Sequence, residues 1–173
     1  LFAFFSIATL CTSAQEKTIN LRHITSQQGL SDNQVTCTIR DKQGFMWIGT
    51  RDGLNRYDGR DFYVFKHNDN DSNSISGNII SCLEIDGDSL LWIGTASSGL
   101  SSYNFRTGKF NSYNNSNSGL NVNSINDIAY DKGRNCLWIA MNNAGLQIFD
   151  LKTKSTDKKE RRISTNTYYD VMV

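Results

Sequence analysis

Apolar and polar residues alternate in short runs along residues 35–151, and the same succession of runs occurs three times. Each repeat begins with an alternating run, passes through a polar turn and enters an apolar run that starts at Trp47, Trp92 or Trp138. Two further alternating runs follow in the first two repeats. Alternation with a period of two, bounded by Gly, Asn, Asp and Ser, is typical of β-strands. The pattern predicts four short strands in each of the first two repeats and a partial set in the third.

The apolar runs read WIGTRDGL, WIGTASSGL and WIAMNNAGL, and their tryptophans lie 45 and 46 residues apart. A fixed period of this length marks an array of supersecondary units that bury their hydrophobic faces against one another. Four antiparallel strands in each such unit predict a β-propeller blade. Propellers typically need about four to eight blades, so we expect an all-β fold with about three four-stranded blades in an incomplete ring. The predicted blades cover residues 31–66, 76–114 and 122–152.

Hairpin turns are expected at residues 41–44, 86–89 and 131–134, because Asp and Gly there favour turn geometry. In the third repeat, the positions that match Phe110 and Tyr113 of the fourth strand are Thr156 and Lys159. The apolar pattern therefore ends after about Lys152. We predict an atypical or disordered tail at 153–173, and a linker or a reading-frame error would give the same pattern.

The first ten residues, LFAFFSIATL, are almost wholly apolar, and small residues follow them. This length fits the core of a secretory signal. We predict an N-terminally truncated signal peptide at 1–14, cleaved after Ala14, and hence export; a buried N-terminal strand is the alternative. Residues 15–152 would then form the partial propeller. Within them, residues 18–25 are expected to be an outer strand that pairs with a final blade outside this chain.

Composition and charge narrow the functional classes. The formal net charge is +1, and residues 152–162 hold six basic and two acidic residues, so the remainder carries 1 − 4 = −3. Nothing before residue 151 resembles a nucleic-acid footprint. Cys37 and Cys82 each stand ten residues before a tryptophan, where the third repeat has Ile128, which indicates a buried apolar position instead of a disulfide. No metal-ligand spacing is found, and we expect no cofactor.

Three stretches together resemble the two-component regulator propeller repeat. They are GLSDNQV, RDKQGFMWIGTRDGLNRYDG and SGNIISCLEIDGDSLLWIGTASSGLSSYN. The resemblance covers roughly residues 18–151. The third repeat departs from it, with Ala140 and Met141 where Gly and Thr would stand.

The resemblance implies a periplasmic sensor region of a hybrid two-component system, of the kind found in Bacteroidetes. It implies a longer parent protein with two propellers, a small β-sandwich, a span of the inner membrane, a histidine kinase, a receiver and a DNA-binding domain. The ligands that it implies are oligosaccharides from glycan breakdown, whose binding switches on genes for glycan use.

Two sets of residues follow from the repeat. The residues that recur in register should build the blades, because recurrence in one slot is a packing signature. They are Trp47, Gly49, Gly53, Trp92, Gly94, Gly99, Trp138 and Gly145. Ligand contacts should come instead from the turns that differ between repeats. The candidates are Arg51, Asp52, Ser97, Ser98, Asn142 and Asn143.

Three functions fit a propeller: a sensor that binds a small ligand, an enzyme such as a lyase or glycosidase, and a protein-interaction scaffold. No nucleophile motif or phosphate-binding loop occurs, and Asp52, Asp58 and Asp61 are expected to serve local turn hydrogen bonds. We therefore predict a non-catalytic sensor. The expected partners are an oligosaccharide or other small ligand, the remaining blades of the parent propeller and, as a further candidate, a second copy in a homodimer. We expect no nucleic acid, and a membrane only through the parent protein.

Overall fold

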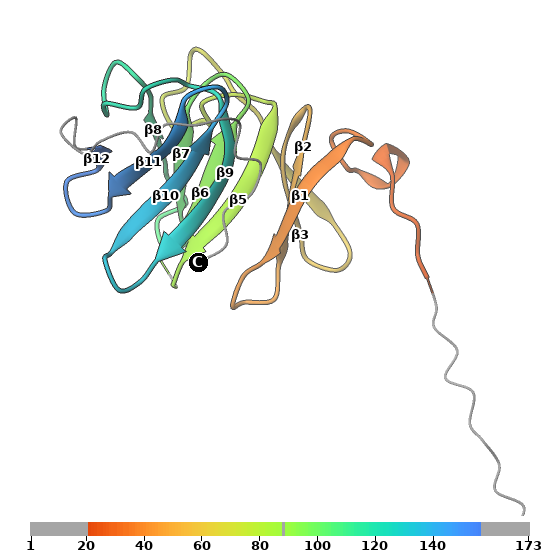
Figure 1. Cartoon of the computed structure of the whole chain (residues 1–173). Helices are drawn as coiled ribbons and strands as arrows, with labels where there is room; N and C mark the ends of the chain where they lie inside the picture. Colours follow the sequence, from red (N-terminus) through yellow and green to blue (C-terminus); the bar gives the residue numbers. More distant parts are fainter. Residues whose placement is uncertain (1–20, 88, 157–173) are drawn as a thin grey trace, which may run out of the picture.

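The computed structural model describes residues 21–87 and 89–156 of the 173-residue chain. Apart from one short 3-10 helix, η1 (Ser26–Gln28), the regular elements of these residues are β-strands. Figure 1 shows the strands gathered into sheets that follow one another along the chain. The strands are β1 (Val35–Arg40), β2 (Met46–Thr50), β3 (Gly53–Tyr57), β4 (Phe62–Phe65), β5 (Ile80–Asp86), β6 (Leu90–Thr95), β7 (Leu100–Asn104), β8 (Phe110–Tyr113), β9 (Ile125–Asp131), β10 (Cys136–Met141), β11 (Gly145–Asp150) and β12 (Ser155–Thr156).

The strands form three four-stranded antiparallel sheets, which we name blades 1, 2 and 3. Blade 1 holds β1 to β4, blade 2 holds β5 to β8 and blade 3 holds β9 to β12, each in chain order. Strand β5 lies against both β1 and β9, so the first strands of adjacent blades are neighbours. Sheets of this kind need only short turns between consecutive strands. The prediction of an all-β fold made of four-stranded propeller blades that do not close a ring is confirmed.

One aspartate closes each hairpin turn and also binds the tryptophan of the following strand. In blade 1, Asp41 accepts the Phe45 backbone N–H on Oδ1 at 3.0 Å and the Trp47 Nε1–H on Oδ2 at 2.8 Å. Asp86 does the same for Leu90 and Trp92, both at 2.9 Å. A buried indole N–H needs such a partner. The aspartate thus fixes the tryptophan that will face the next blade.

The tryptophans of blades 1 and 2 pack against the following blade. Trp47 is 1% exposed, and its ring lies 5.1 Å from Tyr103 and 6.0 Å from Phe105 of blade 2. Trp92 is fully buried, with its ring 5.7 Å from Phe149 of blade 3. Two apolar cores result, one between each pair of blades. Hydrophobic burial between the blades, and not within a single sheet, therefore stabilises the array.

The glycine two residues after each of these tryptophans allows the next blade to approach. A Cβ atom on Gly49 would lie 2.7 Å from Ile80 Cγ2 of blade 2, and one on Gly94 would lie 2.8 Å from Ile125 Cγ2 of blade 3. Both distances are shorter than carbon atoms tolerate, so only glycine fits. Blade 3 carries Ala140 at the corresponding position.

Blade 3 has a fourth strand, which the apolar pattern did not predict. Strand β12 pairs with β11 so that Thr156 lies opposite Phe149, in the same register as Phe110 opposite Tyr103 in blade 2. Thr156 donates its backbone N–H to Ser118 O at 2.9 Å and its hydroxyl to Gly119 O at 2.6 Å. Polar contacts replace the apolar ones of the other blades. The blade therefore ends later than the predicted boundary at residue 152.

The third hairpin is one residue longer than the others, which corrects the predicted alignment of the cysteines. Trp47 pairs with Ile39, eight residues earlier, whereas Trp138 pairs with Ala129, nine residues earlier. Cys37 and Cys82 lie opposite Gly49 and Gly94. The residue opposite Ala140 is Asp127, and Ile128 lies one position further along. Counting back from the tryptophan was wrong for this blade, because the insertion falls inside the turn.

The predicted N-terminal elements are only partly within the described residues. The signal peptide at 1–14, residues 18–20 of the expected outer strand and tail residues 157–173 lie outside them. Residues 21–25 form no strand. Their expected partners would belong to a blade outside this chain, so that pairing stays a prediction. Within the described part of the chain, no helix is long and apolar enough to cross a membrane.

Replacing Asp86 with alanine should weaken the junction between blades 2 and 3. The change removes the acceptor of two hydrogen bonds, from Leu90 and from Trp92. Because hydrogen bonds to a charged group contribute about 1.5–3 kcal/mol each, we expect the free energy of unfolding to fall by about 2 kcal/mol or more. Urea denaturation followed by tryptophan fluorescence measures it. Asp61→Ala, whose side chain is 71% exposed, is the control; equal losses for both variants would contradict the role of Asp86.

Candidate functional site

The β2–β3 turn of each blade shares one face with the segments that enter the blades. The backbone N–H groups of Arg51, Ala96 and Asn142 donate to the carbonyls of Gln34, Ile79 and Ser124, each just before the first strand of its own blade. Gly53 and Gly99 donate to Asn78 and Asn123, which lead into the next blade, both at 2.8 Å. We name this surface the turn face. It consists of residues 50–53, 95–99 and 141–145 with the connections 66–79 and 114–124.

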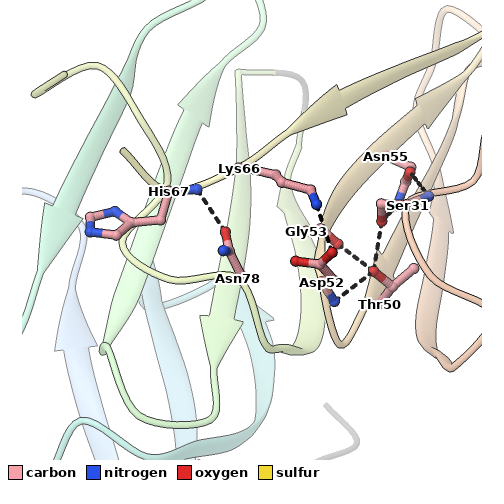
Figure 2. A network of polar contacts seen from close by, with 8 residues as sticks. All are labelled: Ser31, Thr50, Asp52, Gly53, Asn55, Lys66, His67 and Asn78. Carbon is pink, nitrogen blue, oxygen red and sulfur yellow. Dashed lines mark hydrogen bonds and ion pairs between the residues drawn. The ribbon is translucent and has the colours of Figure 1, made fainter. Parts of the chain in front are cut away.

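A polar network holds the turn face of blade 1 in place (Figure 2). The Thr50 hydroxyl donates to Gly53 O at 2.9 Å and accepts the Asp52 backbone N–H at 3.1 Å. It also lies 2.8 Å from the Ser31 hydroxyl. Asn55 accepts the Ser31 backbone N–H at 2.9 Å and donates to the Ser31 hydroxyl at 2.8 Å. Because Thr50 and Asn55 are fully buried, these bonds satisfy polar groups that water cannot reach.

Blades 2 and 3 repeat this arrangement with other side chains. Ser101 on β7 accepts the Ser76 backbone N–H at 3.0 Å, and Gln147 on β11 accepts the Asn121 backbone N–H at 3.0 Å. A residue in the middle of the third strand thus ties down the segment that enters the same blade. Sequence reasoning missed these residues. The available signal was the apolar residue before each tied position, at Leu30, Ile75 and Leu120.

The six candidate ligand-contact residues all lie in the turns of this face, but two of them are engaged within it. The Asp52 carboxylate lies 2.6 Å from Lys66 Nζ, and both side chains are 47% exposed. Ser98 is half-buried, and its side chain lies against Gly77. The other four are exposed: Arg51, Ser97, Asn142 and Asn143. These four present a guanidinium, a hydroxyl and two amides, and their role in binding stays a prediction.

The carboxylates with shifted pKa values serve local structure. Asp58 accepts the backbone N–H groups of Arg60 and Asp61 at 2.8 and 2.7 Å, and these bonds lower its pKa. Asp52 and Asp58 lie at opposite ends of β3, so they do not form an acid/base pair. Burial raises the pKa of Glu84, whose carboxylate interacts with the Tyr130 backbone N–H in the next blade. Within the described residues, no group of three or more His, Cys, Asp or Glu could hold a metal ion.

Comparison with known proteins identifies the first of the repeats. The two-component regulator propeller family matches residues 29–52, which span the first hairpin and its tryptophan. The chain therefore carries a repeat of the two-component regulator propeller family. Over 72 residues, or 42% of the chain, this propeller is 40% identical to histidine kinase P4 of Formosa agariphila. It spans 5% of that protein's length.

Two similar solved structures are extracellular domains of bacterial one- or two-component systems. The regulator propeller is similar to one from Bacteroides thetaiotaomicron, named as part of a hybrid two-component system, with a TM-score of 0.71 and 30% identity over 79% of this chain. A second domain from the same organism, named as part of a one-component system, gives a TM-score of 0.64 and 25% identity over 75%. The regulator propeller spans 19% of each. It is thus a propeller segment of the type found in extracellular regions of such systems.

His67 stabilises the connection between blades 1 and 2. Its Nδ1 lies 2.7 Å from Ile75 O and its Nε2 lies 2.9 Å from the Asp69 carboxylate, so both ring nitrogens face acceptors. Only the imidazolium ion can donate at both nitrogens. The Ile75 carbonyl and then Asp69 accordingly raise the pKa of His67.

This arrangement predicts a pH dependence of stability. Because the folded-state pKa is raised, the contribution of His67 is fully present below about pH 6.5 and is lost as the pH rises through the folded-state pKa. The difference in free energy of unfolding between the wild type and His67→Gln should therefore be larger at about pH 5.5 than at about pH 8. Urea denaturation at both pH values measures it, with His23→Gln as the control. A difference that grows with pH would contradict the assignment.

Proposed function

We propose that this chain is part of a periplasmic sensor that binds an oligosaccharide on its turn face and passes the signal to a histidine kinase in the same longer protein. The single observation that carries the proposal is that the turns of this face are fixed while some of their polar side chains stay exposed. Backbone hydrogen bonds tie all three turns to the segments that enter the blades, while Arg51, Ser97, Asn142 and Asn143 remain exposed.

The chemistry of the exposed groups suits a carbohydrate. Hydroxyl groups of a sugar both donate and accept hydrogen bonds, and the amides of Asn142 and Asn143 can do both as well. The Arg51 guanidinium adds donors in a fixed geometry. Rigid turns reduce the conformational entropy that a ligand would otherwise have to overcome on binding. A small polar ligand that touches several blades at once therefore fits this face better than an apolar one.

The kind of parent protein supports the signalling role. Relatives with these blades are named as a histidine kinase and as extracellular domains of regulatory systems. In the proposed protein, the propeller lies in the periplasm and a span of the inner membrane joins it to the kinase. The propeller itself performs no reaction. Closure of the ring by further blades would extend the turn face over additional turns.

The proposal is tested with the complete extracellular region of the parent protein and a panel of defined oligosaccharides. We expect calorimetry to find one that binds and is recovered uncleaved. The double variant Arg51→Ala/Asn142→Ala should weaken binding at least tenfold, or about 1.4 kcal/mol. Gln43→Ala is the matched control, because this exposed polar residue lies in a hairpin turn between strands 1 and 2 and outside the turn face.

Two results would contradict this function. Appearance of shortened or unsaturated sugars would identify a glycosidase or lyase. Equal loss of binding in the Gln43→Ala control and the double variant would show that the turn face is not the site.

A further inference from the structure

The outer strand of blade 1 differs in chemistry from that of blade 2. Among the described residues, strand β4 pairs only with β3, so no described strand covers its other edge. Tyr63 and Val64 on this strand are 54% and 42% exposed. By strand register, the matching residues of β8 are Asn111 and Ser112, which are exposed and polar. A free edge with exposed apolar side chains is a template for pairing with another strand.

Beneath this edge lies Arg56, which forms no ion pair with a carboxylate of the described residues. Arg56 stands opposite Tyr63 on β3, and its guanidinium carbon lies 4.7 Å from the Tyr63 ring and 4.9 Å from the Phe45 ring. The two rings hold the guanidinium by cation–π contacts. Within the described residues, its Nε atom is buried without a hydrogen-bond partner. A buried donor of this kind calls for a physical explanation.

The other charged groups near β4 are already engaged. Lys66 pairs with Asp52 at 2.6 Å, and Arg60 lies 3.9 Å from Asp61. Asp58 accepts hydrogen bonds from two backbone N–H groups of its own turn. A carboxylate of another molecule could therefore bind Arg56 at this edge. The guanidinium binds a carboxylate with two parallel hydrogen bonds, which gives geometric specificity as well as affinity.

We propose that β4 is a docking edge for an extended segment of a partner protein that carries an acidic side chain. The segment would add a fifth strand to blade 1 through backbone hydrogen bonds, contact Tyr63 and Val64, and place its carboxylate on Arg56. This function goes beyond ligand binding on the turn face and does not depend on it. Pairing of two copies through their Tyr63 residues would set Arg60 of one copy beside Lys66 of the other, so charge favours a different partner.

The probe is a fluorescein-labelled peptide of alternating threonine and valine with one central glutamate, together with the same peptide carrying glutamine. Fluorescence anisotropy with the full chain should show the glutamate peptide binding about tenfold more tightly than the glutamine peptide. Arg56→Met should abolish this preference. Tyr63→Asn/Val64→Ser, which gives β4 the residues of β8, should weaken both peptides at least tenfold. Asn111→Ala/Ser112→Ala on β8 is the matched control and should change neither.

Three other results would overturn the proposal. Equal affinity of the two peptides for the wild type would remove the role of Arg56. If Arg56→Met does not fold, as judged by circular dichroism, the surface variant Tyr63→Asn/Val64→Ser still decides whether the edge is used. Self-association in sedimentation that this surface variant abolishes would identify a second copy as the occupant. Displacement of the peptide by sodium glucuronate at equal concentration would identify a free acidic sugar instead.

Discussion

The bond between an aspartate carboxylate and an indole N–H is the contact on which the arrangement of the blades depends. The distance from the tryptophan Nε1 to the aspartate Oδ2 is 2.8 Å in blade 1, 2.9 Å in blade 2 and 3.4 Å in blade 3, where the hairpin is one residue longer. The aspartate closes the turn with its other oxygen, so one residue couples the hairpin to the orientation of the tryptophan. In blades 1 and 2 that tryptophan then supplies a large apolar surface to the next blade. Local turn chemistry and packing between blades are therefore joined at a single side chain.

A cation lies over each of these tryptophans, yet it comes from a different place every time. Arg56 on the third strand lies 5.9 Å from the Trp47 ring, Lys154 of the next blade lies 4.8 Å from Trp92, and Arg134 of the hairpin turn lies 5.6 Å from Trp138. Burial lowers the pKa of Lys154, as expected for an ammonium partly removed from water. A cation thus packs on each tryptophan ring, although the segment that supplies it differs between the blades. Because Arg56 stands opposite Tyr63 of β4, it also lies near the edge of blade 1 where we propose that a partner binds.

The residues that fix the turns differ from the exposed residues that we propose for ligand binding. Buried polar residues such as Thr50 and Asn55 form hydrogen bonds with the backbone. These bonds stabilise the turn face of blade 1 without involving the exposed side chains. The turn face and the β4 edge are separate surfaces, because the first lies at the ends of the strands and the second along an outer strand. The two proposed binding sites therefore do not overlap.

Much of the fold was determined by the sequence alone, because a period of two within strands and a spacing of 45 and 46 residues between tryptophans report directly on strands and blades. The turn positions of Arg51 and Asn142 followed from the same alignment. Three features were decided only by the tertiary structure. They are the fourth strand at Ser155–Thr156, the pairing of Asp127 in place of Ile128, and the ties made by Asn55, Ser101 and Gln147. The first and the last depend on hydrogen bonds between segments far apart in the sequence, and the second depends on the extra residue in the third hairpin turn. None of these leaves a hydrophobic period in the chain.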